Sequence, residues 1–453
     1  MNTHLNIKST VLLFLIFCLQ QNIAAQSDSV QTLPTKQHQV TFAAQVRPRA
    51  EIRYGNFQPM PANQKIAALI SQRTRLSFNY QYKQLLSLQI TPQSVTIWGQ
   101  ENLTQGTVTK NSLALFEAWF KLYAGSAVSF TVGRQVISLD DERFFGELDW
   151  AQGARAHDAV SFQFEKPKGA LRVYAAYNQN YKAIYGNNLS NVSGNLFSPI
   201  DAAPYKWMQT AWGRYNVHTQ HAISALVTNL GFQDAKDAAD SAKTYFTQVF
   251  GLNYFYTGAH WQFTASGYYQ MGKNPQGKNT SAYLAAINLN RKIGKQWNIG
   301  IGGDLVSGND VGTGNSSINK AFVPFFGTNH KFYGSMDYYY AGNAHKNSGL
   351  VDAYFKTNYH PSKKVSLALA FHQFVSPNKL EDAGKTLASN LGQEIDLDCA
   401  YNIHKFVKLI GGYSMYVATP STNFLKNVTP SNPLQHWVWL SINVNANFLN
   451  MKF

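Results

Sequence analysis

The chain has 453 residues, a formal net charge of +15 and two cysteines; 14% of its residues are aromatic and only 14% are charged. Soluble domains carry about 25% charged residues, so this composition favours a surface that contacts lipid. The length and the two cysteines exclude a small disulfide-stapled fold. So basic a chain would attract nucleic acid, but it has no Lys/Arg-rich helix and no recognisable nucleic-acid module, so we expect no such partner.

The amino end predicts an exported protein. Lys8 precedes an apolar run over 11–19, and small residues follow up to Ala25. This order is typical of a secretory signal peptide over 1–25, with cleavage before Gln26. A membrane anchor is disfavoured, because the run is about half the roughly 20 residues that a spanning helix needs.

Cleavage would leave 453 − 25 = 428 residues and a net charge of +14, because Lys8 is the one charged residue removed. Only Cys399 would remain, so the exported protein has to be stabilised by closure of a sheet rather than by an internal disulfide. Residues 26–39 are polar and have little pattern, which predicts a flexible periplasmic lead-in. The remaining residues, 40–453, form the predicted membrane domain.

Apolar and polar side chains alternate with period two from about residue 40 to the end of the chain. Over 40–54 one face holds Val40, Phe42, Ala44, Val46, Ala50, Ile52 and Tyr54, and the other holds Thr41, Gln45, Arg47, Arg49, Glu51 and Arg53. Such a strand is typical of a barrel wall, with lipid outside and water inside. A soluble sandwich is disfavoured, because an inner row of arginines would be buried without water.

The alternating runs predict an all-β fold, a transmembrane antiparallel up-and-down barrel of about 18 strands of about 10 to 14 residues each. In chain order the predicted strands are 40–54, 70–82, 85–98, 113–123, 127–137, 154–165, 170–179, 208–218, 221–231, 244–257, 260–271, 281–292, 296–307, 349–360, 364–375, 391–404, 406–418 and 435–448.

Short and long connections alternate between these strands. The long ones are 138–153, 180–207, 308–348 and 419–434. Outer-membrane barrels have short periplasmic turns and long extracellular loops, so an even strand number would place both chain ends in the periplasm. The predicted location is the outer membrane of a Gram-negative bacterium, where membrane lipid is a partner.

The chain ends on an aromatic residue, Phe453, in the last predicted strand. This end resembles the signal that the barrel-assembly machinery reads, and we expect that machinery to be a partner. Leu449, Met451 and Phe453 lie on the opposite parity to Phe448, so we predict a β-bulge at this point.

The alternation also predicts which charged side chains face the barrel interior. The basic ones are Arg47, Arg49, Arg53, Arg73, Arg75, Lys121, Arg172, Arg214 and Lys356, and the acidic ones are Glu51, Glu117, Asp352, Glu394, Asp396 and Asp398. Their net positive field would favour anions. The alternative is that they only keep the interior hydrated and rigid. For the arginines of the first two strands we favour selectivity.

The segment 133–159 is dense in charges, glycine and tryptophan. Parity points Arg134 toward lipid, so we expect a bulge at Gly133, or the strand end, to turn it inward. With Arg155 and Asp158 it is then counted among the pore-lining residues. The segment could fold inward and constrict the pore, or form an outer loop held by arginine–carboxylate pairs.

Enzyme function is not supported by the motifs. The carboxylates within 140–149 suggest a glycosidase pair, and His157 with Asp158 suggests part of a hydrolase site. Neither comes with a Gly-x-Ser-x-Gly or His-Glu-x-x-His motif, a Walker loop or paired cysteines. The Gly-rich loop after Asp304 lacks the spacing of an EF-hand. We therefore predict no catalytic residue, no metal and no cofactor.

Several stretches resemble the alginate-export family of outer-membrane barrels. The segment from Gly133 to Ala159 resembles its signature GRQ...D..R..G...W.Q..R..DA. Further stretches resemble the family in the same order: Arg47-Pro48-Arg49, Gln72-Arg73-Thr74-Arg75, Gly303-Asp304 with Ser307-Gly308, Phe322 to Asp337, and Gly392 with Glu394-Ile395-Asp396-Leu397. The resemblance implies an eighteen-stranded barrel whose cationic interior passes an anionic polysaccharide outward, with the GRQ and Glu-Ile-Asp stretches contributing to a constriction.

The leading hypothesis is a passive outer-membrane channel whose positively charged interior passes anionic solutes, including export of an acidic polysaccharide such as alginate. One alternative is a porin for uptake of other small anions. A hypothesis from another class is a barrel-borne surface enzyme or adhesin that acts through its long loops, and a weaker one is a structural barrel with a plugged interior.

Overall fold

The computed structural model describes residues 37–100, 113–178, 205–233, 243–313, 316–340, 345–430 and 432–453. The chain divides into two compact units, Met1–Gln37 and His38–Phe453, and every described strand belongs to the second. The predicted signal peptide, 1–25, and nearly all of the lead-in, 26–39, lie outside the described residues and stay predictions. Within the described ranges, no helix has both the length and the apolar character to cross a membrane.

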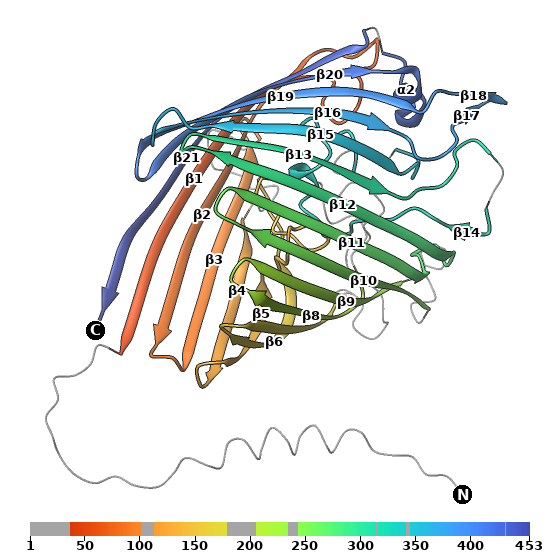
Figure 1. Cartoon of the computed structure of the whole chain (residues 1–453). Coiled ribbons are helices and arrows are strands. Elements are labelled where there is room, and N and C mark those ends of the chain that lie inside the picture. The colour runs from red at the N-terminus through yellow and green to blue at the C-terminus, as the bar shows by residue number, and fades with distance from the viewer. Residues whose placement is uncertain are drawn as a thin grey trace, which may run out of the picture. The chain divides into compact units, whose positions relative to one another are not determined.

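Eighteen long strands form a closed antiparallel barrel (Figure 1). They are β1 (His38–Tyr54), β2 (Ala67–Tyr82), β3 (Leu86–Ile97), β4 (Leu113–Ala124), β5 (Val128–Gln135), β6 (His157–Lys166), β7 (Gly169–Tyr177), β8 (Trp207–His218), β9 (His221–Gln233), β10 (Thr244–Thr257), β11 (Trp261–Lys273), β12 (Asn279–Ile293), β13 (Trp297–Val306), β15 (Leu350–Tyr359), β16 (Val365–Val375), β19 (Asn390–His404), β20 (Val407–Ala418) and β21 (Leu434–Lys452). Each pairs with the next along the chain, and β1 pairs with β21 to close the ring.

Short elements occupy some of the connections. They are β14 (Ile318–Asn319), the 3-10 helix η1 (Asn329–Lys331), the small hairpin of β17 (Glu381–Asp382) and β18 (Lys385–Thr386), and the helix α2 (Pro420–Lys426). The helix starts at a threonine cap, Thr419, whose side chain accepts a hydrogen bond from the backbone N–H of Thr422.

The predicted fold class is confirmed. Each of the 18 predicted strands corresponds to one wall strand, and the largest shift is in β21, which continues to Lys452 instead of ending at 448. The predicted bulge is also present: Phe42 pairs with Leu449 and Ala43 with Asn447, so Phe448 has no partner in β1. One extra residue in β21 therefore accounts for the change of parity near the chain end.

The outer face of the wall is apolar. On β12, Tyr283 and Ile287 are exposed, whereas the alternate residues Ala282, Leu284 and Ala286 are buried. The same alternation places Ile52, Leu76, Ile301 and Leu440, among others, on the exposed face of their strands. An apolar exposed band around a closed sheet is the surface expected against acyl chains.

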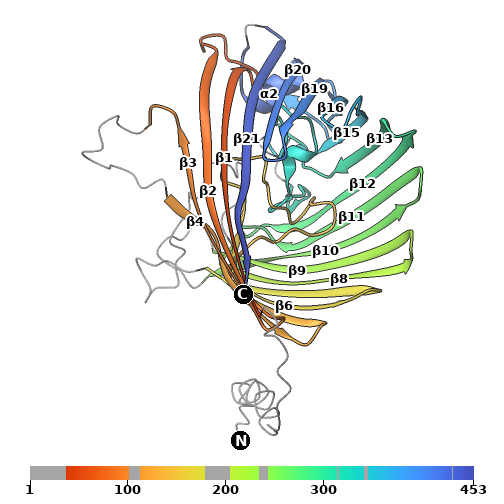
Figure 2. The same cartoon turned by 90° about the vertical axis from the view of Figure 1, so that its left-hand side faces the viewer.

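Two stretches of chain lie inside the ring of strands (Figure 2). The first inner segment, 137–156, connects β5 to β6, and it hydrogen-bonds to β2, β9, β10 and β11 through Ser71, Ser224, Asn253 and Ser266 respectively. Strands so far apart on the ring can be reached by one segment only from the interior. Of the two alternatives for this stretch, the inward one is therefore correct.

The second inner segment, 320–340, lies between β14 and β15. Gln270 of β11 donates to the carbonyl of Val323 at 2.6 Å, and the Tyr339 hydroxyl lies 2.9 Å from that of Tyr416 on β20. This part of 308–348, which the sequence predicts as an outer loop, thus folds into the barrel. Several of its backbone groups, such as the carbonyl of Val323 and the amides of Ser335 and Met336, hydrogen-bond to wall residues in place of water.

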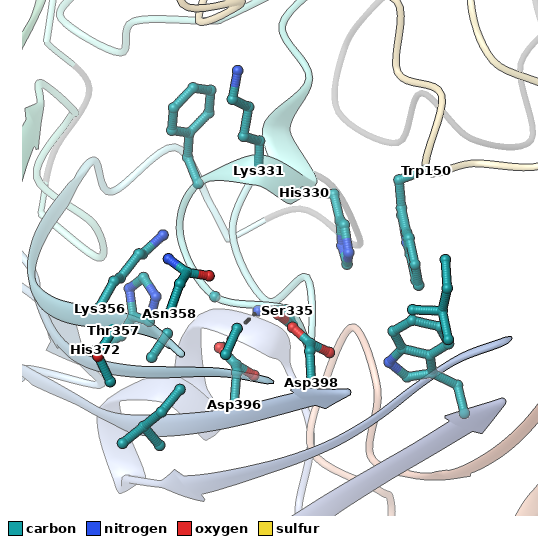
Figure 3. Close-up of a pocket in the computed structure, with 17 residues that line it drawn as sticks. Trp150, His330, Lys331, Ser335, Lys356, Thr357, Asn358, His372, Asp396 and Asp398 are labelled. Carbon is teal, nitrogen blue, oxygen red and sulfur yellow. Dashed lines mark hydrogen bonds between the residues drawn. The ribbon is translucent and has the colours of Figure 1, made fainter. Parts of the chain in front are cut away.

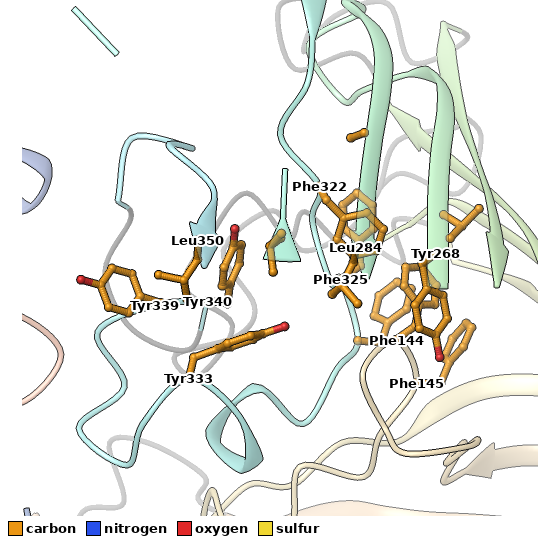
Figure 4. Close-up of a cluster of buried hydrophobic side chains, with 14 of the residues drawn as sticks. Phe144, Phe145, Tyr268, Leu284, Phe322, Phe325, Tyr333, Tyr339, Tyr340 and Leu350 are labelled. Atoms are coloured by element: carbon orange, nitrogen blue, oxygen red, sulfur yellow. The ribbon is translucent and has the colours of Figure 1, made fainter. Parts of the chain in front are cut away.

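The barrel interior is partly dry, which the sequence did not predict. Phe144 and Phe145 of the first inner segment pack with Phe322 of the second and with Tyr268 and Leu284 of the wall (Figure 4). The expectation of water inside the wall is wrong for this part of the barrel. The inner segments supply aromatic rings that fill the space, and burial of their apolar area stabilises that arrangement by about 25 cal/mol per Å².

Candidate functional site

Five arginines gather on the inward face of the first two strands. Arg47, Arg49 and Arg53 alternate along β1, and Arg73 and Arg75 alternate along β2. The register pairs Arg47 with Arg73, so guanidinium groups from the two strands lie side by side. This basic wall follows from period-two alternation on adjacent strands and agrees with the sequence prediction.

Three of these arginines converge on one carboxylate, that of Asp149 in the first inner segment. Nη1 of Arg73 donates to Asp149 Oδ1 at 2.8 Å, Nη1 of Arg75 lies 3.4 Å from the same oxygen, and Nη1 of Arg47 lies 3.5 Å from Oδ2. Burial alone would raise the pKa of Asp149, but the hydrogen bond from Arg73 and the three positive charges lower it below its ordinary value. Asp149 is therefore ionised at neutral pH.

The basic wall also holds the backbone of the first inner segment. Arg47 donates to the carbonyls of Asp149, Trp150 and Ala151 at 2.8 to 3.3 Å, and Arg49 donates to that of Trp150 at 3.0 Å. The Arg49 guanidinium also lies over the Trp150 ring, 4.4 Å from its centroid. Charge on the wall thus fixes the path of a segment that has no regular secondary structure.

Glu51 balances part of the positive charge. Its carboxylate accepts hydrogen bonds from Arg49 at 3.0 Å and Arg53 at 2.7 Å, and from the indole Nε1 of Trp437 on β21 at 3.1 Å. These bonds engage Arg49 and Arg53 within the wall. Arg47, Arg73 and Arg75 are the members of the cluster that share Asp149.

Carboxylates gather on a second region of the wall. Glu394, Asp396 and Asp398 alternate on the inward face of β19, and Asp304 of β13 and Asp352 of β15 lie on nearby strands. The Met336 N–H donates to Glu394 Oε1 at 2.7 Å and the Ser335 N–H donates to Asp396 Oδ2 at 3.4 Å. This acidic wall holds the second inner segment.

Two buried acids of this region have cationic or titratable partners. Arg143 of the first inner segment forms a bidentate pair with Asp304, at 2.5 and 3.0 Å, and Nδ1 of His372 lies 2.9 Å from the Asp352 carboxylate. Arg143 thus ties the first inner segment to β13.

A cavity of about 440 Å³ lies between the second inner segment and the strands β15, β16 and β19 (Figure 3). Its lining includes Trp150, His330, Lys356, Asp396 and Trp439. Trp150 stacks on His330 with ring centroids 4.3 Å apart and packs against Trp439 at 4.7 Å. The two inner segments therefore meet at the edge of this cavity.

The family of this chain can be identified by comparison with known proteins. The family model for alginate export matches residues 38–437, which is most of the chain. The chain belongs to the alginate export family. The resemblance found in the sequence is thereby confirmed at the level of the family. A search of curated proteins gives no match.

Solved structures of outer-membrane barrels are similar in fold to this family member. OpdL of Pseudomonas aeruginosa has a TM-score of 0.60 at 13% identity, with 90% of this chain and 99% of that chain covered. OccAB4 of Acinetobacter baumannii has a TM-score of 0.59 at 10% identity, covering 92% and 100%. The outer membrane protein opdK of Pseudomonas aeruginosa has a TM-score of 0.57 at 12% identity, covering 91% and 99%. At such low identity the likeness concerns the barrel architecture alone.

Most other residues that the sequence singled out lie on the inward face, away from Asp149. Lys121 donates to Gln163, Glu117 accepts from the Trp119 indole, Arg172 pairs with Glu165, Arg214 lies over Phe255, and Lys356 lies over Tyr354. The structure does not bring them into one cluster. In this family member these inward charges are therefore engaged in separate contacts.

Arg155 acts between the two inner segments rather than on the wall. Its guanidinium donates to the carbonyl of Gly327 at 3.0 Å and to that of Gly146 at 3.4 Å. Burial lowers the pKa of Arg155 to about 10, since a charged group is costly to remove from water.

The prediction that Arg134 and Asp158 line the interior is wrong. They pair directly across β5 and β6 with no shift of register, and they form an ion pair of 2.8 Å on the outer face, with side chains 40% and 58% exposed. The predicted bulge that would turn Arg134 inward is absent, so neither residue lines the interior. Because the two charges pair with each other near a strand end, neither side chain has to turn toward the interior.

The same geometry disfavours the hydrolase fragment. His157 points inward and its Nδ1 lies 2.9 Å from the Tyr205 hydroxyl, whereas Asp158, the next residue on the strand, points outward. Successive side chains of a strand lie on opposite faces, so these two cannot act together.

Several residues of the site were missed. Gln45 and Gln93 orient Arg73 and Arg75, and Trp439 lines the cavity. The sequence did indicate that Trp439 faces inward, because Trp437 and Trp439 share the parity of Ser441 on the polar face of β21. Glutamines on a polar face are too common to be singled out.

Proposed function

We propose that this member of the alginate export family is an outer-membrane channel for anionic solutes, which bind at the basic wall on their way through. The observation that carries the proposal is the convergence of Arg47, Arg73 and Arg75 on a single carboxylate. A set of arginines that holds one carboxylate has the charge and the donor geometry to hold another.

A channel must also release the anions that it binds. Conduction requires that each site binds well enough to attract an ion and weakly enough to release it. Arg49 and Arg53, already engaged by Glu51, offer a partly neutralised path beside the three arginines. An anion handed along such a row meets several weak sites in place of one strong one.

An acidic polysaccharide, such as alginate, and a small anion are both candidates within this class. The two inner segments, which fill part of the barrel interior, favour small anions over a polymer. For this reason we keep uptake of a small carboxylate as a second candidate function beside export of a polysaccharide.

Reversal potentials of the purified protein in planar bilayers under a potassium chloride gradient test the proposal. We expect chloride preference in the wild type and a several-fold lower preference in the double variant Arg47→Gln/Arg75→Gln. Arg134→Gln, which removes a positive charge from the outer face, is the matched control and should change nothing. Cation preference in the wild type would contradict the proposal.

Block of the current by oligomeric and monomeric uronates separates the two candidates. Stronger block by the oligomer at equal uronate concentration favours polymer transport. Block by the monomer alone favours small anions.

A further inference from the structure

We propose that Asp149 is a built-in competitor: it occupies a carboxylate-binding site formed by the wall, and an incoming carboxylate binds by displacing it. The inference rests on the proposed function and specifies the site and the ligand class. The displaced element is the Asp149 side chain together with its part of the first inner segment.

The site belongs to the wall rather than to the inner segment. The Nε of Arg73 donates to Gln45 at 3.0 Å, and the Nε of Arg75 donates to Gln93 at 2.5 Å. Each glutamine fixes one edge of a guanidinium, so that the terminal nitrogens point at the carboxylate. The two arginines and two glutamines come from β1, β2 and β3, so this part of the site persists when Asp149 leaves.

The site has more donors than Asp149 uses. Among the described residues, the buried Nη2 atoms of Arg73 and Arg75 have no hydrogen-bond partner, although both side chains contact Asp149 through Nη1. A buried donor without a partner is unfavourable. Three guanidinium groups therefore face one carboxylate that leaves part of their hydrogen-bonding capacity unused.

The occupant is the accessible part of the site. The side chain of Asp149 is 45% exposed, whereas that of Arg73 is fully buried. An anion in the barrel interior therefore meets Asp149 first and can take its place without moving the wall.

The inner segment is suited to local movement at this point. Leu148, directly before Asp149, has a φ of +51°, and Asp140, Glu142 and Ala154 of the same segment also have positive φ. Non-glycine residues in this region store backbone strain, which a small displacement can release. The hydrogen bonds from Arg47 and Arg49 to the carbonyls of 149–151 limit how far the segment moves.

The ligand class follows from the present occupant. A carboxylate already fits the site, and an incoming carboxylate offers the same two oxygens to the three guanidinium groups. Uronates and short aliphatic carboxylates have this group in common.

Binding of glucuronate to the purified barrel in detergent, measured by titration calorimetry, tests the inference. If Asp149 occupies the site most of the time, Asp149→Asn should tighten glucuronate binding by about tenfold, because the competitor is removed. Glu147→Gln, which removes one negative charge from the same segment, is the matched control and should leave the affinity near that of the wild type. In Asp149→Asn, an added Arg75→Gln should abolish the gain.

Two outcomes would overturn the inference. Affinity in Asp149→Asn equal to or weaker than in the wild type means that Asp149 does not compete. Equal increases of potassium and chloride conductance in that variant, without tighter binding, mean that Asp149 is only a tether. Failure of the proposed function would look different, since the wild type and all variants would then lack chloride preference.

Discussion

The basic wall of β1 and β2 and the acidic wall around β19 each hold one inner segment in place, and they do so with opposite charges. At the basic wall, arginines donate to carbonyls and to the Asp149 side chain of the first inner segment. At the acidic wall, Glu394 and Asp396 accept from backbone N–H groups of the second. Every peptide unit has a donor and an acceptor, so a wall of either sign can hold a segment without regular structure.

The difference lies in what each segment contributes. The first contributes a charged side chain, Asp149, which another anion can replace. The second contributes backbone amides, Ser335 and Met336, at a glycine turn. The basic wall should therefore be sensitive to side-chain identity, and the acidic wall to backbone conformation.

The largest expected effect comes from the ion pair that links the first inner segment to Asp304 in the acidic region. Arg143→Met leaves Asp304 buried without a partner and should cost about 3–5 kcal/mol. Denaturant unfolding of the refolded barrel in micelles measures this cost. The control Arg172→Met removes a more exposed pair with Glu165 and should cost about 1 kcal/mol or less. Equal costs for the two variants would show that the link contributes no more than a surface pair.

The aromatic contact between the inner segments ranks next. Trp150→Ala removes the stack on His330 and the packing against Trp439, each worth about 0.5–1.5 kcal/mol beyond buried area. Hydrogen exchange should increase in both inner segments, and Trp150→Phe should restore part of the protection. An increase confined to 137–156 would mean that the segments are not coupled here.

A glycine substitution tests the acidic wall. Gly334 has a φ of +84°, and a Cβ there would lie 2.5 Å from a carboxylate oxygen of Glu394. Gly334→Ala should cost about 1–2 kcal/mol in backbone strain alone and should increase hydrogen exchange at 334–336.

Gly384→Ala is the matched control for that substitution. Gly384 has a similar φ, +81°, but open space around the added Cβ. If both variants leave exchange at 334–336 unchanged, the close fit against Glu394 has no role in holding the segment.

The smallest effect concerns pH at the basic wall. The pKa of Asp149 in the folded protein lies below its ordinary value of 3.8, so its contribution is complete above 3.8 and is lost as pH falls through the lowered value. Protease protection of 137–156 should therefore persist to pH 3.8 and decrease below it. Asp149→Asn should remove this step. A decrease that begins near neutral pH would contradict the assignment.

Much of the wall was predictable because each strand obeys one local rule. A slip of one residue would turn every apolar side chain of a strand inward, so the pattern fixes both the strand and its outer face. The bulge at Phe448 followed from a break in the same rule. The rule also indicated the inward arginines of β1 and β2, since they share a parity with other polar residues.

The prediction failed where it departed from the rule, by expecting a bulge to turn Arg134 from the lipid-facing side to the interior. Arg134 stays on the outer face because Asp158 lies directly opposite and pairs with it. Alternation gave the correct face for Arg134 but does not show the partner that makes this face acceptable for a charged side chain. It also does not indicate whether inward positions meet water or rings, which is why the dry cluster around Phe144 was not predicted.

The sequence by itself determined the wall strands and the side of the wall on which most charges lie, because these depend on neighbours one or two positions away. Only the tertiary structure decided what fills the interior. The inner segments have no periodicity, and their contacts join residues far apart in sequence, such as Arg73 and Asp149, which are 76 positions apart. Which carboxylate meets which arginine depends on the path of the whole chain through the barrel.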